Sequence, residues 1–197
     1  RYDRYFKAAA FSAEIGVLRE NGQLFGAPSA GALALSDSAV TAYATLEAEF
    51  DLGPDWLLSA QAGFARTDTS RAQASVFTNI GSFNSSSFRI QAERGNLFFS
   101  NDRLGFSISQ PLKVESGSAL VTVPTAVAYS PGHTEVLFES ADIALSPDAR
   151  EIDLEFGYSW RLNNDLRLQA NFLHQFNAGH VSGYNANAIL LRMARAF

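Results

Sequence analysis

Apolar and polar residues alternate with a period of two through most of the C-terminal half of this chain. The alternation is strictest from Glu151 to Leu162, and it resumes after a short gap, from Leu166 to Phe176. Because successive side chains of a β-strand point to opposite faces, this pattern predicts strands with one apolar and one polar face. Each run is longer than the roughly 5–6 residues of an ordinary strand. The two runs therefore predict a tight hairpin of two long strands.

The same pattern continues through the rest of the chain and predicts an all-β fold of about ten antiparallel strands. Their expected ranges are 5–18, 38–52, 55–69, 86–96, 102–116, 118–130, 134–147, 149–162, 164–177 and 184–197. The first range also fits an amphipathic helix with Phe6, Ala10 and Val17 on one side. The seventh range changes phase between Phe138 and Ile143, as a β-bulge would cause.

The connections between these strands are expected to differ in length at the two ends of the sheet. Those at one end are short turns, at 53–55, 100–102, 131–133 and 163–164. Those at the other end include the three longest in the chain, 19–37, 70–85 and 178–183, together with tight connections near Gly117 and at 147–148. Short turns at one end and longer loops at the other are typical of outer-membrane β-barrels.

The composition narrows the classes of function. The chain has 197 residues, a net charge of -5 and no cysteine. This length predicts a single domain over residues 1–197. The acidic balance argues against binding of nucleic acid, which needs a basic surface. The absence of cysteine from the sequence excludes disulfides and cysteine nucleophiles, and no apolar run reaches the roughly 18–20 residues of a transmembrane helix.

Alternating strands fit either a soluble β-fold or a membrane barrel, and the two differ in the direction of the apolar face. The expected strands are long enough to cross a bilayer at a tilt, which takes about 9–11 residues. Charges of both signs occur in mid-strand, whereas lysine occurs only at Lys7 and Lys113. These features favour an antiparallel transmembrane up-and-down β-barrel. The charged residues expected to face its lumen are Glu47, Glu49, Arg89, Glu93, Arg103, Lys113, Glu151, Asp153, Glu155, Arg161 and Arg167.

The last expected strand ends on Phe197, with Ile189, Leu191 and Met193 at alternate positions before it. This ending resembles the signal that outer-membrane barrels present to their assembly machinery. Arg195 falls on the apolar register, where an arginine near the membrane interface costs only about 0–1 kcal/mol. The alternative is that Phe197 is simply an aromatic last residue.

Several segments together resemble a known family. They are DRLGFSISQPLKVE at 102–115, ALSPDAREIDLEFGYSWRL at 144–162 and ANFLHQFNAGH at 170–180. They look like the C-terminal β-barrel of subtilase-type autotransporters of α-proteobacteria, over a stretch from about Ser12 to Phe197. The resemblance implies an integral protein of the outer membrane of Gram-negative bacteria, acting in type V secretion. It also implies a barrel of about twelve strands around a luminal helical segment.

In such a family the barrel carries a passenger, often a serine protease, to the cell surface. The implied partners are outer-membrane lipid, the barrel assembly machinery and the chain's own passenger. A stand-alone porin-like or structural barrel is the alternative, and a soluble β-sandwich or binding module is a third possibility. The presence of coding sequence upstream would separate the first two.

The sequence predicts no catalytic, cofactor or metal site. His133 and His180 are expected in turns, and His174 is expected on the apolar register of its strand. The nucleophile-elbow motif G-x-S-x-G is missing from the sequence, as are the motifs of phosphate and dinucleotide loops. Any protease activity would therefore reside in an upstream passenger.

Glu151, Asp153 and Glu155 form an acidic row along one face of their strand. Such a row could bind a cation or act as a carboxylate cluster. The favoured interpretation is a luminal stripe paired with Arg103, Arg161 or Arg167 on neighbouring strands. An extended passenger could slide past this stripe, or a luminal helix could be held by it.

Overall fold

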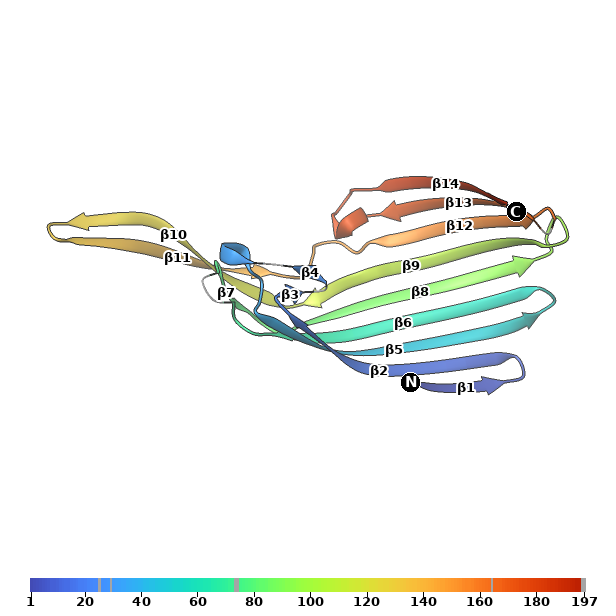
Figure 1. The fold of residues 1–197 in the computed structure, drawn as a ribbon, viewed down its shortest axis with the longest axis horizontal. Coiled ribbons are helices and arrows are strands. Elements are labelled where there is room, and N and C mark those ends of the chain that lie inside the picture. The colour runs from blue at the N-terminus through green and yellow to red at the C-terminus, as the bar shows by residue number, and fades with distance from the viewer. Residues whose placement is uncertain (25, 29, 73–74, 164, 196–197) are drawn as a thin grey trace.

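The chain is an all-β protein built around a large antiparallel sheet (Figure 1). The computed structural model describes residues 1–24, 26–28, 30–72, 75–163 and 165–195. Within these ranges nine strands form the large sheet, in the order β1-β2-β5-β6-β8-β9-β12-β13-β14. The strands are β1 (Tyr2–Phe6), β2 (Ala9–Asn21), β5 (Ser38–Gly53), β6 (Trp56–Thr69), β8 (Phe83–Gly95), β9 (Asp102–Ser116), β12 (Ile152–Arg161), β13 (Leu166–Phe176) and β14 (Ala186–Arg195).

The described residues also form two smaller sheets and two short 3-10 helices. One sheet has the order β11-β10-β7, with β7 (Phe77–Ile80), β10 (Ser118–Ser130) and β11 (His133–Ala144). The other pairs β3 (Gln23–Leu24) with β4 (Ala27–Pro28). The 3-10 helices are η1 (Gly31–Leu33) and η2 (Ala178–His180). No helix in the described part of the chain is long and apolar enough to cross a membrane.

The all-β class and the antiparallel arrangement predicted from alternation are confirmed. The helical alternative for the first range is wrong, because residues 2–21 form the hairpin of β1 and β2. Closure into a barrel is not observed, since among the described residues β1 and β14 are the two ends of the sheet and do not pair with each other.

The place of β10 and β11 differs from expectation. β9 pairs directly with β12, so β10 and β11 are not members of the large sheet and instead project from it as a hairpin (Figure 1). The turn between β10 and β11, at residues 131–132, therefore lies at the far tip of this hairpin, on the side of the long loops and not on the side of the short turns (Figure 1). Alternation identifies an extended segment, but it carries no information about which neighbour that segment pairs with.

We call the two ends of the large sheet the turn end and the loop end. The turn end holds the short connections β1–β2, β5–β6, β8–β9 and β12–β13, whereas the loop end holds the longer ones (Figure 1). A small core lies at the loop end, where Ile80, Phe83 and Ala119 are buried. Leu24, Leu35, Phe77, Val114 and Leu145 pack against it. The core thus joins the long loops to the base of the hairpin.

Gly117 is the residue at which the chain leaves the large sheet and enters the hairpin. Its φ of +144° favours glycine, and a Cβ built there would lie 2.5 Å from the Cβ of the buried Phe83. We expect Gly117→Ala to lower the free energy of unfolding by about 2 kcal/mol or more, because the backbone strain and the clash with Phe83 add.

The matched control for this prediction is Gly22→Ala, at a φ of +64° with no atom within 4 Å of the added Cβ. It isolates the cost of positive φ, about 1 kcal/mol. Urea unfolding of both variants would measure the difference, and equal losses would contradict the role given to Phe83.

Candidate functional site

One face of the large sheet is polar over its whole width. Cross-strand partners share a face, so the continuous registers connect residues of nine described strands into one row. This row contains Asp3, Ser12, Glu47, Gln61, Arg89, Ser109, Asp153, Gln175 and Ala186. We call this side of the sheet the polar face.

Charged groups on the polar face are paired between strands. Arg89 Nη2 lies 2.9 Å from Glu155 Oε2, and it joins β8 to β12 across β9. Asn171 on β13 donates to the same carboxylate at 3.0 Å. Arg103 Nη1 on β9 lies 2.8 Å from Glu93 Oε2 on β8. These contacts link strands of the large sheet through side chains, and Arg89–Glu155 links two strands that are not neighbours.

The acidic row predicted from the sequence is divided among several partners. The Gln175 amide donates to Glu151 at 2.7 Å and to Asp153 at 3.2 Å, whereas Glu155 pairs with Arg89. Arg89 on β8, and not the expected Arg103, Arg161 or Arg167, is therefore the arginine paired with this row among the described residues. The long arginine side chain reaches past the serine at 107 on β9 to do so.

Arg161 and Arg167 are directly opposite each other at the turn end of the polar face. Like charges at directly opposed positions destabilise a sheet. They line a cavity of about 920 Å³ with Arg103, and Asp51 and Asp55 line its other side. This cavity at the turn end thus has arginines from β9, β12 and β13 on one side and carboxylates from the end of β5 and the β5–β6 turn on the other.

Most of the charged residues expected to face a lumen lie on the polar face or beside it. Glu47, Glu49, Arg89, Glu93, Arg103, Asp153, Glu155, Arg161 and Arg167 occupy its register positions. Glu151 precedes β12 and bonds the polar-face residue Gln175. Whether this face lines a lumen stays a prediction.

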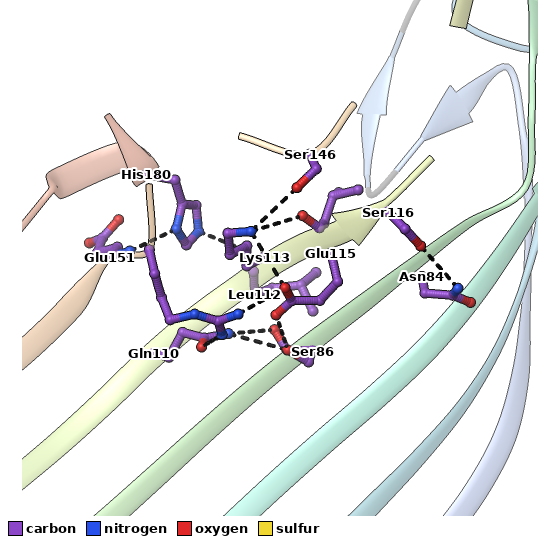
Figure 2. A network of polar contacts seen from close by, with 12 residues as sticks. Asn84, Ser86, Gln110, Leu112, Lys113, Glu115, Ser116, Ser146, Glu151 and His180 are labelled. Atoms are coloured by element: carbon purple, nitrogen blue, oxygen red, sulfur yellow. Dashed lines mark hydrogen bonds and ion pairs between the residues drawn. The ribbon is translucent and has the colours of Figure 1, made fainter. Parts of the chain in front are cut away.

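Lys113 departs from the expected face. The register of β9 shifts between Ser86 and Phe88 of β8, so Lys113 pairs with Ser86 on the opposite side of the sheet. Its side chain is only 8% exposed, and its ammonium donates to Glu115 and Ser146 at 3.4 Å each (Figure 2). Pro111 lies at this bulge, where its missing N–H is tolerated. A proline inside an alternating strand was the sequence signal for this change of face.

A network at the loop end was not expected from the sequence. Glu115 accepts a hydrogen bond from Ser86 at 2.6 Å and lies 2.8 Å from Arg150 Nη2. Arg150 also bonds Gln110. Figure 2 shows Gln110, Glu115 and Lys113 gathered on β9 beside Ser86. These contacts connect the strand pair β8–β9 to the segment that leads into β12, and such tertiary contacts leave no periodic trace in the sequence.

Hydrogen bonds of His180 connect η2 to β9 and to the residue that precedes β12. The backbone N–H of Glu151 donates to its Nδ1 at 2.9 Å, so that nitrogen is the acceptor and Nε2–H donates to the Leu112 carbonyl at 3.1 Å (Figure 2). Gly179 N–H donates to the Glu151 carboxylate at 2.7 Å. The ring is thus held by structural contacts on both nitrogens.

The other histidines lie apart from one another. His174 on β13 bonds Asn187 on β14 at 2.7 Å, and His133 is exposed at the tip of the hairpin. Among the described residues, no group of three or more His, Asp or Glu side chains is placed to hold a metal ion.

The other side of the large sheet is apolar, and we call it the apolar face. One row across it contains Phe11, Ala48, Ala60, Ile90, Ile108, Leu154 and His174. A second row contains Phe50, Leu58, Ala92, Phe106, Phe156, Phe172 and Ile189. The large apolar residues of this face are well exposed; Ile90 is 50% exposed and Leu191 is 75% exposed. Among the described residues, charges on the apolar face lie toward its margins, as at Arg66, Arg94 and, on the edge strand β1, Arg4.

Aromatic rings gather on the apolar face at the turn end. Phe99 stacks on Trp160 with ring centroids 4.4 Å apart, and Phe98 meets Tyr158 edge to face. Arg94 lies over the ring of Trp56. Both tryptophans of the chain therefore lie at one level of this face.

The residues expected to form an assembly signal lie on the last strand of the sheet. Ile189, Leu191 and Met193 share the apolar face of β14, and each is more than 70% exposed. Phe197 lies outside the described residues.

No protein-family model, no curated protein and no solved structure matches this chain.

Proposed function

We propose that this chain forms the wall of an outer-membrane β-barrel that serves as the translocator of an autotransporter. The single observation that carries the proposal is the contrast between the two faces of the large sheet. The apolar face is broad and exposed, and from β2 to β14 its middle rows carry no charged residue, whereas ion pairs and hydrogen bonds of side-chain amides cross the polar face. An outer-membrane barrel has this polarity, with apolar side chains toward lipid and charged ones toward the lumen.

The alternative of a sheet in water requires a cover for the apolar face. Exposed apolar surface costs roughly 25 cal/mol per Å² in water, and a patch of this breadth exceeds what soluble monomers normally expose. In the described part of the chain no second layer covers the two rows that contain Ile90 and Phe156, and these two residues are 50% and 49% exposed. In a membrane, lipid would cover this surface, so that no second protein layer would be needed.

The aromatic residues at the turn end agree with a membrane boundary. Tryptophan and tyrosine concentrate where the hydrocarbon meets the head groups, because their rings are amphipathic. Trp56, Tyr158 and Trp160 occupy one level of the apolar face. We assign this level to the interface on the side of the short turns, which is the periplasmic side in such barrels.

The translocator role rests on the open edges of the large sheet and on the resemblance to autotransporter barrels. The outer edges of β1 and β14 have no strand partner among the described residues, and in lipid every backbone group needs one. We therefore propose that further strands complete the wall, as the resemblance to autotransporter barrels of about twelve strands implies. The polar face would then line the passage of a passenger. The stand-alone porin-like barrel remains the second candidate, because the ion pairs of the polar face would suit a narrow charged pore equally well.

The test is expression of this chain in a Gram-negative host, together with any sequence encoded upstream of it and with an epitope placed before Arg1. We expect the chain in the outer-membrane fraction, resistant to extraction by urea and released by detergent, with the epitope accessible to antibody on intact cells. An epitope accessible only after the outer membrane is permeabilised would favour the porin-like barrel. A chain that stays in solution without detergent would contradict both membrane roles.

A further inference from the structure

The hairpin of β10 and β11 is the part of the molecule that the proposed wall does not use. It extends beyond the loop end, away from the large sheet (Figure 1). Every residue of β11 is exposed, and so is β10 from Val123 onward. Its apolar side chains include Tyr129, which is 79% exposed, and Phe138, which is 64% exposed. An isolated two-stranded hairpin of this kind is marginal in water, so a partner strand would stabilise it.

The two edges of the hairpin differ in their capacity to accept another strand. β10 pairs with β7 at residues 119–121, and further along it carries Pro124 and a register shift before Ala126. Prolines and bulges are devices that block edge pairing. β11 has neither over its twelve residues, and in the described chain no strand occupies its outer edge. The outer edge of β11 is thus the open one.

The negative charge of this hairpin indicates which kind of strand would bind to it. Residues 118–144 contain Glu135, Glu139 and Asp142 but no lysine or arginine. A second copy of β11 on this edge would bring its own carboxylates, and like charges on adjacent strands repel. Glu135, Leu137 and Glu139 alternate onto one face of β11. A strand with two basic residues four positions apart, and an apolar residue between them, would match that face.

We infer that the outer edge of β11 is a docking site for an extended, basic polypeptide segment, which adds to the hairpin as a further strand. Backbone hydrogen bonds would supply affinity, and the acidic side chains would supply selectivity, as in other cases of β-strand addition. The inference goes beyond the proposed wall, because it concerns a part of the chain outside the large sheet.

The probe is a fluorescent peptide of about eleven residues with the core Lys-Thr-Val-Thr-Lys, and its counterpart has glutamate in place of lysine. Binding to the whole chain in detergent is followed by anisotropy. We expect the lysine peptide to bind more tightly, and Glu135→Lys with Glu139→Lys to weaken it about tenfold, since each cross-strand charge pair contributes modestly. The same double variant should bind the glutamate peptide better than the parent does.

Two further variants separate edge addition from general attraction of charge. Asp148→Lys changes an exposed acid outside the hairpin, and it should leave binding of the lysine peptide within about twofold. Val136→Pro should block strand addition while leaving the three acids in place. Equal binding of both peptides, an equal loss in Asp148→Lys and in the double variant of Glu135 and Glu139, or no binding of either peptide would overturn the inference. None of these outcomes depends on where the chain is located in a cell.

Discussion

Replacement of Ile90 by arginine should lower the free energy of unfolding in phospholipid vesicles by about 2–4 kcal/mol, the cost of an arginine near the middle of a lipid-facing strand. Ile90 lies near the middle of β8 on the apolar face and is 50% exposed. In water an arginine at so exposed a position would change stability by no more than about 0.5 kcal/mol. The size of the effect therefore reports on the surroundings of the apolar face.

Gln91→Arg is the matched control for this substitution. Gln91 is the next residue of β8, on the polar face, and its amide donates to Glu93. An arginine there could pair with the same carboxylate, so we expect a change under about 0.5 kcal/mol. Urea unfolding in vesicles, followed by tryptophan fluorescence, gives both values. A lipid-facing role would be contradicted if Ile90→Arg left the free energy of unfolding unchanged, or if it made the chain more soluble without detergent.

Removal of the Asp102 carboxylate should produce the second large loss. This buried side chain accepts backbone N–H groups of Leu97, Phe98 and Phe99 at 2.7–2.9 Å and the Tyr158 hydroxyl at 2.9 Å. Hydrogen bonds to a charged group contribute about 1.5–3 kcal/mol each, though not additively. We expect Asp102→Ala to lower the free energy of unfolding by about 3 kcal/mol or more, because it leaves the turn between β8 and β9 without its acceptor.

A graded series checks the cause of that loss. Asp102→Asn keeps one acceptor oxygen and should lose less, and Tyr158→Phe removes a single donor and should lose about 1 kcal/mol. Asp55→Asn is the control in a neighbouring turn, where the carboxylate accepts one bond from an exposed amide; we expect a change under about 0.5 kcal/mol. Equal urea midpoints for Asp102→Ala and Asp55→Asn would show that the turn does not depend on this carboxylate.

The candidate site could be predicted from the sequence where strict alternation holds. Asp153, Glu155 and Arg89 lie on the polar face because a period of two fixes the face of each residue once the strand exists. The same reasoning failed at Lys113, because a bulge at Pro111 shifts the phase of β9 by one residue. A bulge is a backbone irregularity, and a single proline is a weak signal of its position.

Alternation along the sequence could not predict which partner each charged side chain binds. Arg89 reaches Glu155 from a strand two places away in the sheet, and that distance depends on strand order. At the loop end, His180 bonds the Leu112 carbonyl and Arg150 pairs with Glu115, because segments far apart in the sequence fold back there. Their contacts are tertiary, and hydrophobic periodicity is a local property.

The sequence by itself determined that this chain is all-β, which segments are extended, and which side chains share a face, because these properties follow from the twofold period of a strand. Only the tertiary structure decided that β9 pairs with β12, so that β10 and β11 leave the sheet as a hairpin. The physical reason lies in the backbone: every extended segment offers the same row of N–H and C=O groups. The choice between partners is then made by turns such as that at Gly117, and by the packing of Phe83 against it.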